Sequence, residues 1–215
     1  MDITLIIFGA LLAYLIGSIP TAVWYARRFH HIEIREHGSG NAGATNTFRV
    51  LGAKSGVIVL IIDILKGWIA TRVANIPYWL DAISENDIVV YKLIFGLIAV
   101  IGHVFPVYEN FKGGKGVATL LGMVMAIQLN VALACLGIFL IVFFSSKYVS
   151  LGSMLAALAY PILLLTKFVP QNHPELMTGF GVVMFLLVVL THRKNVKRLL
   201  KGEESKIYLG RSKPQ

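Results

Sequence analysis

The sequence predicts an all-α integral membrane protein with seven transmembrane helices, and three observations support this prediction. First, 56% of the 215 residues are hydrophobic, only 14% are charged, and the mean hydropathy is +0.73, which is too apolar for a soluble domain of this length. Second, the apolar residues lie in long blocks, and about 20 such residues suffice to cross a bilayer. Third, the positive charges gather in a few of the segments between the blocks.

Six apolar blocks follow one another along the chain. No basic residue precedes the first block, where Asp2 replaces the positive region of a cleavable signal, and Arg27 and Arg28 follow it. We therefore expect the first block to be a retained helix. The blocks cover residues 3–26, 56–75, 88–106, 117–144, 150–168 and 177–191.

The fourth block is too long for a single span. As one helix it would be about 42 Å long, against a hydrocarbon core of about 30 Å. Gln128, Leu129 and Asn130 lie in its middle and predict a turn between two short helices. This turn raises the number of spans from six to seven.

The basic residues predict the orientation. Five of them place the first loop, residues 27–55, in the cytoplasm and the N-terminus outside, namely Arg27, Arg28, Arg35, Arg49 and Lys54. The basic C-terminal tail would lie outside with six spans and inside with seven: Arg193, Lys194, Lys197, Arg198, Lys201, Lys206, Arg211 and Lys213. We expect one membrane domain over residues 1–202 and a cytoplasmic tail, residues 203–215, along anionic headgroups.

The net charge of +9 would suggest nucleic acid as a partner if the chain were soluble. In a membrane protein the same charge marks the cytoplasmic face, so we expect the lipid bilayer and no nucleic acid as partner. Four polar segments are predicted to meet the cytoplasm: residues 27–55, 107–116, 145–150 and the tail from 192. The loops near 76–87, 128–130 and 169–176 carry none of the concentrated glycine and lysine, so function is expected on the inner face.

The first candidate site is the segment from Gly38 to Arg49, which reads Gly-Ser-Gly-Asn-Ala-Gly-Ala-Thr-Asn-Thr-Phe-Arg. It has no apolar period, so we expect neither ordinary helix nor strand. Glycines that turn several N–H groups toward one point, together with hydroxyls and an arginine, bind phosphate or carboxylate. A Gly-x-Gly-x-x-Gly pattern is present, but no strand precedes it, which excludes a dinucleotide fold.

The second candidate site is Phe111–Thr119, in which Gly-Gly-Lys-Gly opens an apolar helix. Unbonded N–H groups, a helix N-terminus and Lys115 together favour an anion. It is not a P-loop, because Glu109 stands where glycine is required. Lys112 also suits a lysine that snorkels to the interface. His103, one turn inside the helix before it, is interpreted either as a base or as a hydrogen-bonded structural residue.

Two further segments are weaker by themselves. Ser145–Ser153 is a short connection with helix-capping serines, and Thr191–Asn195 places His192 and Asn195 on one helix face. Asp63 and Lys66, three residues apart in an apolar block, are either functional or a structural ion pair. The single cysteine, Cys135, is assigned to core packing, and no zinc-ligand spacing occurs, so no metal or other cofactor is expected.

Taken together, these segments resemble the bacterial acyl-phosphate:glycerol-3-phosphate acyltransferase family. The resemblance rests on Ser-Gly-Asn-x-Gly-Ala-Thr-Asn, then Gly-His-x-Phe-Pro with Phe-Lys-Gly-Gly-Lys-Gly-Val-Ala-Thr, then Tyr-Val-Ser-Leu, and extends from Gly17 to Asn195. It implies a seven-helix protein of the bacterial cytoplasmic (inner) membrane with its active site facing the cytoplasm. The implied reaction moves a fatty acyl group from acyl phosphate to the 1-hydroxyl of glycerol 3-phosphate. The products are lysophosphatidate and phosphate, at the start of phospholipid synthesis, with a functional link to the soluble enzyme that makes acyl phosphate.

The resemblance also assigns roles to residues. The implied catalytic residues are Ser39, Lys115, His192 and Asn195. The implied substrate-binding residues are Gly40, Asn41, Gly43, Thr45, Asn46, Arg49, His103, Lys112, Gly113, Gly114, Gly116 and Ser153. Lys147 departs from the family, which often has arginine there, so bidentate recognition is not expected at this position.

Two other classes were weighed against the enzyme. A transporter of a small organic phosphate also builds anion sites from short helices beside glycine-rich breaks, but here the polar segments gather on one face. A membrane phosphotransferase would need a carboxylate cluster for metal, for which only Glu33 and Glu36 are available. The acyltransferase is therefore the favoured hypothesis and the transporter its alternative.

Overall fold

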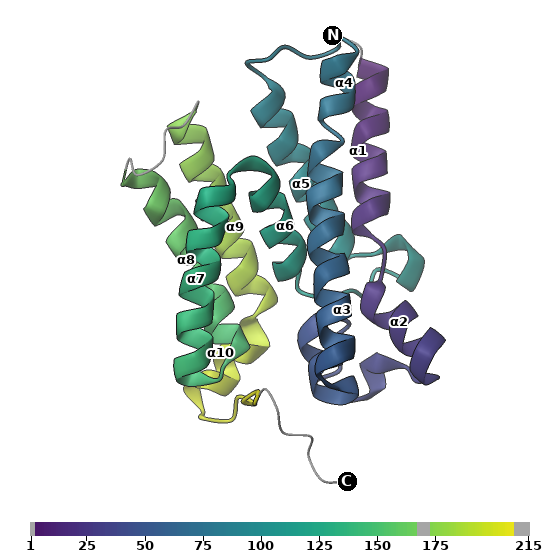
Figure 1. Cartoon of the computed structure of the whole chain (residues 1–215), viewed down its shortest axis with the longest axis vertical. Coiled ribbons are helices and arrows are strands. Elements are labelled where there is room, and N and C mark those ends of the chain that lie inside the picture. Colours follow the sequence, from purple (N-terminus) through teal and green to yellow (C-terminus); the bar gives the residue numbers. More distant parts are fainter. Residues whose placement is uncertain (1–2, 167–172, 209–215) are drawn as a thin grey trace. The chain divides into compact units, whose positions relative to one another are not determined.

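The predicted all-α fold is confirmed. A computed structural model describes residues 3–166 and 173–208, and these contain helices and no strand (Figure 1). The elements are α1 (Ile3–Gly17), α2 (Thr21–His30), η1 (Ile34–Glu36), α3 (Ala44–Arg72), α4 (Asn75–Trp79), α5 (Ile88–Val104), η2 (Val107–Glu109), α6 (Val117–Ile127), α7 (Leu129–Ser146), α8 (Val149–Leu165), α9 (Pro174–Thr191) and α10 (Arg193–Leu200).

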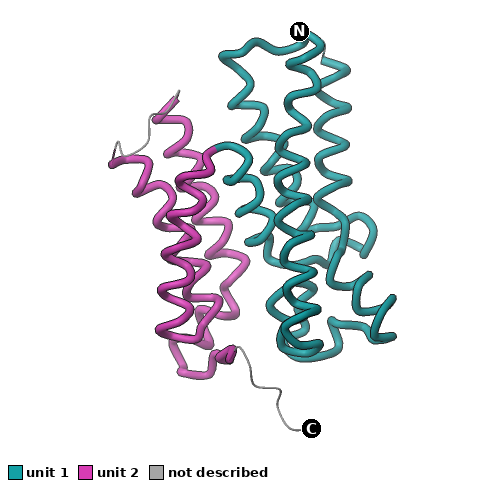
Figure 2. The backbone as a smooth tube through the Cα atoms, viewed as in Figure 1, with its two compact units in different colours: residues 1–127 teal, residues 128–215 magenta. Residues whose placement is uncertain are grey.

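The chain divides into two compact units, Met1–Ile127 and Gln128–Gln215 (Figure 2). In the first unit α3 packs along α6 and also contacts α1, α2 and α5, while α1 packs on α5. In the second unit α8 packs against both α7 and α9, and α10 follows α9. A single domain over residues 1–202 remains a prediction.

The first apolar block is not the single helix over residues 3–26 that we predicted. α1 ends at Gly17, α2 begins at Thr21, and the two helices are bent by 41°. Pro20 lies in the break and has no N–H to continue the helical hydrogen bonds. Gly17 lies so close to α5 that an added Cβ would collide with the backbone of Ala99.

The prediction that Gly38–Arg49 is not helical is wrong for its second half. α3 begins at Ala44 and runs to a kink at Gly52, whose φ of +83° lies in the left-handed region. The polar residues in this stretch are tolerated because their groups have partners: the buried Asn46 side chain donates to the Ile34 and His37 carbonyls, and the buried Thr47 hydroxyl donates to the Gly43 carbonyl. Burial thus overrides the weak helical propensity of the sequence.

The break predicted within residues 117–144 is confirmed at Gln128, whose φ and ψ of −144° and 85° are not helical. α6 before it is short, with 11 residues. α7 after it, also predicted to be short, has 18 residues and is long enough to cross a membrane.

Three helical segments of the described chain are long and apolar enough to cross a membrane by themselves: Ile88–Glu109, α7 and α9. The count rises to four if α1 and α2 form one bent span, and α6 and α8 are shorter apolar helices. Transmembrane helices are therefore present, whereas seven spans and the orientation of the termini remain predictions.

Small residues allow the helices of the first unit to approach closely. An added Cβ at Gly67 of α3 would collide with the Thr119 carbonyl of α6, and one at Gly122 of α6 would collide with the Ile64 carbonyl of α3. Small residues at such contacts are characteristic of helix packing in membranes. The packing holds the start of α6, and with it the Gly-Gly-Lys-Gly segment, against α3.

Candidate active site

The first candidate segment is a turn held by Asn46. Gly38 and Gly40 have φ of +63° and +72°, in the region that favours glycine. The Asn46 side chain is 1% exposed, and its Oδ1 accepts from the N–H of Ser39 at 2.8 Å and from the Ser39 hydroxyl at 3.1 Å. Its Nδ2 donates to the carbonyls of Ile34 and His37, both at 3.0 Å. The carboxamide is therefore committed within the protein and orients Ser39.

The other predicted residues of this segment differ in exposure. Ser39, Gly40 and Arg49 are exposed, while Asn41, Gly43 and Thr45 are half-buried. Gly43 is the N-cap residue before α3 and provides no side-chain cap, so the helix N-terminus adjoins the turn. A helix N-terminus attracts anions through its N–H groups and its dipole. The turn therefore combines Ser39 with a helix end suited to a phosphate.

The second candidate segment folds back over the end of α5. Gly113 donates its N–H to the Val104 carbonyl and Gly114 donates to the His103 carbonyl, each at 3.1 Å. Asn110 and Phe111 lie in the left-handed region, with φ of +52° and +59°. These two glycine N–H groups are thus already hydrogen-bonded, so Lys115, Gly116 and the first turn of α6 are the part of the segment suited to an anion.

The close approach explains why glycine is required here. An added Cβ at Gly113 would collide with the His103 carbonyl, and one at Gly114 with Nε2 of the His103 ring. His103 is 7% exposed and lies directly beneath this loop. The ring supports the loop from below, but its Nδ1 has no hydrogen-bond partner among the described residues, so both interpretations of His103, a base or a hydrogen-bonded structural residue, remain predictions.

Asp63 and Lys66 form the ion pair that was one of their two interpretations. Lys66 Nζ lies 2.9 Å from Asp63 Oδ1 and donates to the Ile19 carbonyl at 2.7 Å. The Thr21 hydroxyl donates to Asp63 Oδ1 at 2.9 Å, and His103 Nδ1 lies 3.7 Å from the same oxygen. All of these side chains are buried. The cluster joins α3 to the break between α1 and α2 and to the end of α5.

Two arginines and two glutamates form a charged ring that sequence reasoning missed as part of the site. Its members are Arg27, Glu33, Arg35 and Glu109, and we call them the charged ring. The sequence assigns its members to separate features: Arg27 and Arg35 to the basic first loop, Glu33 to the carboxylates available for metal, and Glu109 to the position that breaks the P-loop pattern. The Glu109 side chain is 7% exposed, which is rare for a carboxylate without close cationic partners.

The charged ring lowers the pKa of Glu33 and raises the pKa of Arg35. The Arg35 side chain holds the pKa of Glu33 at about 2, and the Arg35 N–H and Arg27 assist, against the opposing effect of burial. Glu33 in turn raises the pKa of Arg35, again against burial. The pair is therefore fully ionised at neutral pH.

In the second unit, the predicted residues His192 and Asn195 are both buried. His192 Nδ1 lies 2.8 Å from the Val188 carbonyl. A carbonyl only accepts, so Nδ1 carries the hydrogen, and Nε2 of the neutral ring is an acceptor. The Ser153 hydroxyl donates to the Val149 carbonyl at 2.9 Å, within its own helix.

Glu204, which sequence reasoning placed in the tail, is bound to this group. Its Oε1 accepts from Asn195 Nδ2 at 2.6 Å and from the Ser150 hydroxyl at 2.8 Å, and its Oε2 accepts from Arg198 Nε at 2.7 Å. Burial raises the pKa of Glu204, but the hydrogen bonds from Arg198, Asn195 and Ser150 outweigh burial and lower it overall.

Residues 203–208 of the predicted tail contact the second unit, and their place along headgroups remains a prediction. Besides the contacts of Glu204, Ile207 donates its N–H to the Lys147 carbonyl at 3.0 Å. Polar backbone and carboxylate groups find partners in the unit itself, which the sequence does not reveal. Residues 209–215 of the predicted tail lie outside the described residues, as do residues 169–172 of the loop predicted near 169–176.

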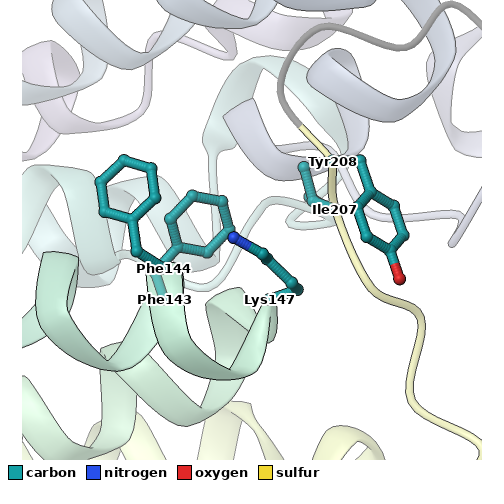
Figure 3. Close-up of a pocket in the computed structure, with 5 residues that line it drawn as sticks. All are labelled: Phe143, Phe144, Lys147, Ile207 and Tyr208. Atoms are coloured by element: carbon teal, nitrogen blue, oxygen red, sulfur yellow. The ribbon is translucent and has the colours of Figure 1, made fainter.

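A pocket in the second unit lies where the tail meets the end of α7 (Figure 3). Its lining residues are Phe143, Phe144, Lys147, Ile207 and Tyr208. None of the predicted catalytic or substrate-binding residues lines it, so we do not assign it to the reaction. Among residues 3–166 and 173–208, no three His, Cys, Asp or Glu side chains are grouped so that they could hold a metal ion.

The family model described as glycerol-3-phosphate acyltransferase matches residues 7–202 of this chain. The chain belongs to the glycerol-3-phosphate acyltransferase family. The resemblance inferred from the motifs is therefore confirmed.

Individual relatives agree with this assignment. The glycerol-3-phosphate acyltransferase of Chlorobaculum tepidum is 42% identical over 93% of this chain and 95% of its own length. The glycerol-3-phosphate acyltransferase of Listeria welshimeri is 44% identical over 96% of this chain and 98% of its own length.

Two crystal structures of PlsY, an integral membrane glycerol 3-phosphate acyltransferase, have the same fold. The glycerol 3-phosphate form is 36% identical, with a TM-score of 0.78 over 94% of this chain and 96% of that chain. The lysophosphatidic acid form is 37% identical, with a TM-score of 0.77 over 94% and 95%. The integral membrane class predicted from composition is thus supported independently of hydropathy.

Proposed function

We propose that this protein transfers a fatty acyl group from an acyl phosphate to the 1-hydroxyl of glycerol 3-phosphate. The products would be 1-acylglycerol 3-phosphate and inorganic phosphate, the first committed step of phospholipid synthesis. The observation that carries the proposal is membership of the glycerol-3-phosphate acyltransferase family over residues 7–202. The related PlsY was crystallised in a glycerol 3-phosphate form and in a lysophosphatidic acid form, which correspond to acceptor and product.

The first unit would supply two phosphate sites. Ser39, oriented by Asn46, lies beside the N-terminus of α3, with Arg49 exposed on its first turns. Lys115 precedes the N-terminus of α6. A lysine or arginine beside a helix N-terminus suits a phosphate, and both substrates carry one. Asn41, Thr45 and the surrounding glycines, Gly40, Gly43 and Gly116, remain proposed contacts, and so does Lys112.

The second unit would contribute to holding glycerol 3-phosphate. His192 presents Nε2 as an acceptor in its neutral form, which suits a hydroxyl of the glycerol moiety. Asn195 donates from its Nδ2 to Glu204 and remains a proposed contact of glycerol 3-phosphate. Ser153 keeps a proposed binding role with its hydroxyl oxygen as acceptor, because its hydrogen is directed to Val149.

The reaction would be a direct displacement. The acceptor hydroxyl oxygen attacks the acyl carbon, the bond between that carbon and the phosphate oxygen breaks, and phosphate leaves with the bonding electrons. The hydroxyl proton passes to the departing phosphate. An acyl phosphate is already activated, so orientation and charge stabilisation suffice without a protein nucleophile. The buried position of His103 beneath Gly114 supports a reaction in which it is not the base.

We also propose seven spans, with the N-terminus outside and the active site on the cytoplasmic side of the bacterial inner membrane. The basic first loop and the basic tail support this orientation. The second part of α3 and the short helices α6 and α8 would complete the count alongside α1, α5, α7 and α9. A cytoplasmic site would receive acyl phosphate from the soluble enzyme that makes it.

The test is phosphate release by the purified protein with palmitoyl phosphate, with and without glycerol 3-phosphate. We expect release that depends on glycerol 3-phosphate, proceeds without coenzyme A or added metal, and is lost in Lys115→Ala. A folded His103→Gln variant that binds both substrates but has lost turnover would contradict the proton transfer to phosphate. No release, with glycerol 3-phosphate still bound and carried into proteoliposomes, would favour the transporter instead.

A further inference from the structure

The charged ring alternates in sign and is closed. Arg27 lies in α2 and Arg35 in η1. Glu33 immediately precedes η1, and Glu109 is the last residue of η2. Each glutamate accepts hydrogen bonds from both arginines. Arg27 binds Glu33 at 2.6 Å and Glu109 at 2.7 Å, while Arg35 binds both glutamates at 2.8 Å. Arg27 joins Glu109, 82 residues away, through two charge-assisted hydrogen bonds, and Arg35 joins Glu109, 74 residues away, through one.

One side of the charged ring leads to Ser39. Glu33 caps η1 by accepting from the Arg35 N–H at 3.1 Å. The carbonyls of Ile34 and His37, within and just after η1, accept from Asn46, whose Oδ1 holds Ser39. Any movement of η1 would therefore be transmitted to the serine turn through a single buried carboxamide.

The other side of the charged ring leads to the Gly113–Gly116 segment. Lys112 donates its N–H to the Glu109 carbonyl at 3.1 Å, and its own carbonyl lies 3.5 Å from Arg35 Nη1. Gly113 and Gly114 follow directly and are pinned to α5. The charged ring therefore meets this segment at Lys112, through Arg35 and through the backbone of Glu109.

We infer that the charged ring is a positioning device, which sets the Ser39 turn and the Gly113–Gly116 segment in one fixed arrangement so that they act on the two phosphates together. This inference rests on the function proposed above. It assigns positioning roles to Arg27, Glu33, Arg35 and Glu109, none of which needs to touch substrate. The fully ionised state of Glu33 at neutral pH supports it.

A purely stabilising role fits the ring less well. Exposed ion pairs contribute only about 0–1 kcal/mol each, and Arg27 is exposed. Burying a carboxylate such as Glu109 costs desolvation free energy. Replacing a buried ion pair by apolar residues often leaves the stability of a protein unchanged or raises it. What an apolar residue could not supply is a directional link between two loops.

The direct test is hydrogen exchange measured by mass spectrometry on Glu109→Gln in detergent, in peptides covering residues 36–48 and 108–118. We expect faster exchange in both peptides, although the substitution lies only in the second. Glu36→Gln is the control, because Glu36 is an exposed carboxylate at the end of η1 and outside the charged ring. It should speed exchange in neither peptide, although residue 36 itself lies in the first. Faster exchange confined to residues 108–118 would overturn the inference.

The kinetic test uses the same variants and Arg35→Lys, which keeps the charge but loses the bidentate fork. We expect kcat/KM for phosphate release to fall at least tenfold in Glu109→Gln and in Arg35→Lys, with Glu36→Gln unchanged. Combined with Ser39→Ala, Glu109→Gln should cost less than it does alone, because the part of its effect that passes through the Ser39 turn is already lost. Independent, additive losses would contradict the inference.

The two proposals fail in different ways. If the wild-type protein releases no phosphate, the proposed function fails, while the exchange experiment still decides whether the charged ring links the two segments. If the wild-type protein is active but Glu109→Gln is folded and equally active, only the positioning role fails. Should Glu109→Gln not fold, Arg35→Lys provides both readouts.

Discussion

At the scale of single residues, Asn46 changes role between sequence and structure. Its place in the Ser-Gly-Asn-x-Gly-Ala-Thr-Asn motif implied contact with substrate. In the folded chain all of its hydrogen-bonding groups are used by Ser39, Ile34 and His37, and the side chain is 1% exposed. We now propose Asn46 as a positioning residue for Ser39, while substrate contact by Ser39 itself remains a proposal.

Asn46→Ala should therefore lower both stability and activity. Removing the carboxamide leaves buried backbone groups unpaired, which costs about 1–3 kcal/mol for each group. Ser39→Ala should lower turnover with little change in the free energy of unfolding, because Ser39 is exposed. Thermal unfolding and phosphate release on the two variants provide the comparison. Equal stability of both variants would show that Asn46 does not hold the turn.

Glu33 predicts a pH dependence of stability. Its pKa is held at about 2 by Arg35, below the ordinary value of 4.5. A lowered carboxyl pKa stabilises the folded state fully above the ordinary value, and that contribution is lost as the pH falls toward the folded value. The melting temperature should therefore be flat from pH 7 to 5 and fall from about pH 4.5 toward 2.

Glu33→Gln isolates this contribution. The variant should melt lower than the wild type at pH 7 and lose less between pH 4.5 and 2, because the titrating group is gone. Carboxylates such as Glu204, whose pKa is also lowered, remain in both proteins and cancel in the difference. Parallel melting curves for both proteins across this pH range would count against the low pKa.

At the scale of elements, the contact between α3 and α6 is the most sensitive to side-chain size. The helices α3 and α6 lie side by side (Figure 1). Gly67 of α3 and Gly122 of α6 each approach the backbone of the other helix. α6 carries the Gly-Gly-Lys-Gly segment at its start, so its packing also determines where Lys115 lies. The sequence shows these glycines in apolar blocks, but not which helix each faces.

Gly122→Ala should destabilise the protein, although alanine is the better helix former. The added methyl would collide with the Ile64 carbonyl, and forcing extra volume into a packed contact typically costs about 1–3 kcal/mol. Gly137→Ala in α7 is the matched control, because an added Cβ there meets nothing within 4 Å. That variant should be neutral or gain up to about 1 kcal/mol. Equal melting temperatures for the two variants would contradict the close contact.

At the scale of the whole molecule, the number of spans remains the main prediction to test. The described chain contains three helical segments that qualify as spans alone and four if the bent pair is one span, whereas charge distribution predicts seven. Short helices such as α6 account for the difference, because length and composition alone do not identify them as spans.

Cysteine labelling can decide the topology. In a Cys135→Ala background, which has no other cysteine, we would introduce Glu36→Cys, Glu85→Cys and Lys201→Cys, all at exposed positions. With seven spans and the N-terminus outside, an impermeant maleimide should label residue 85 in intact spheroplasts, and residues 36 and 201 only after permeabilisation. Labelling of residue 201 in intact spheroplasts would support six spans.

Much of this protein follows from the sequence alone. Composition and block length determined an all-helical membrane protein, the polar residues at 128–130 located a helix break, and ordered motifs identified the family. These features depend on local or compositional physics: apolar blocks partition into lipid, and helices satisfy their own backbone there. A motif is likewise a local pattern, so it can be recognised without knowledge of the fold.

Only the tertiary structure decided how the polar residues are used. It directed Asn46 inward, placed His103 beneath Gly114, brought Glu204 from the tail to Asn195, and closed the charged ring from α2, η1 and η2. It also extended α3 into a segment predicted to be irregular and broke the first block at Pro20. Each outcome depends on partners far away in sequence. The free energy of a polar side chain depends on whether burial provides a partner for it, and a linear sequence does not show which groups folding brings together.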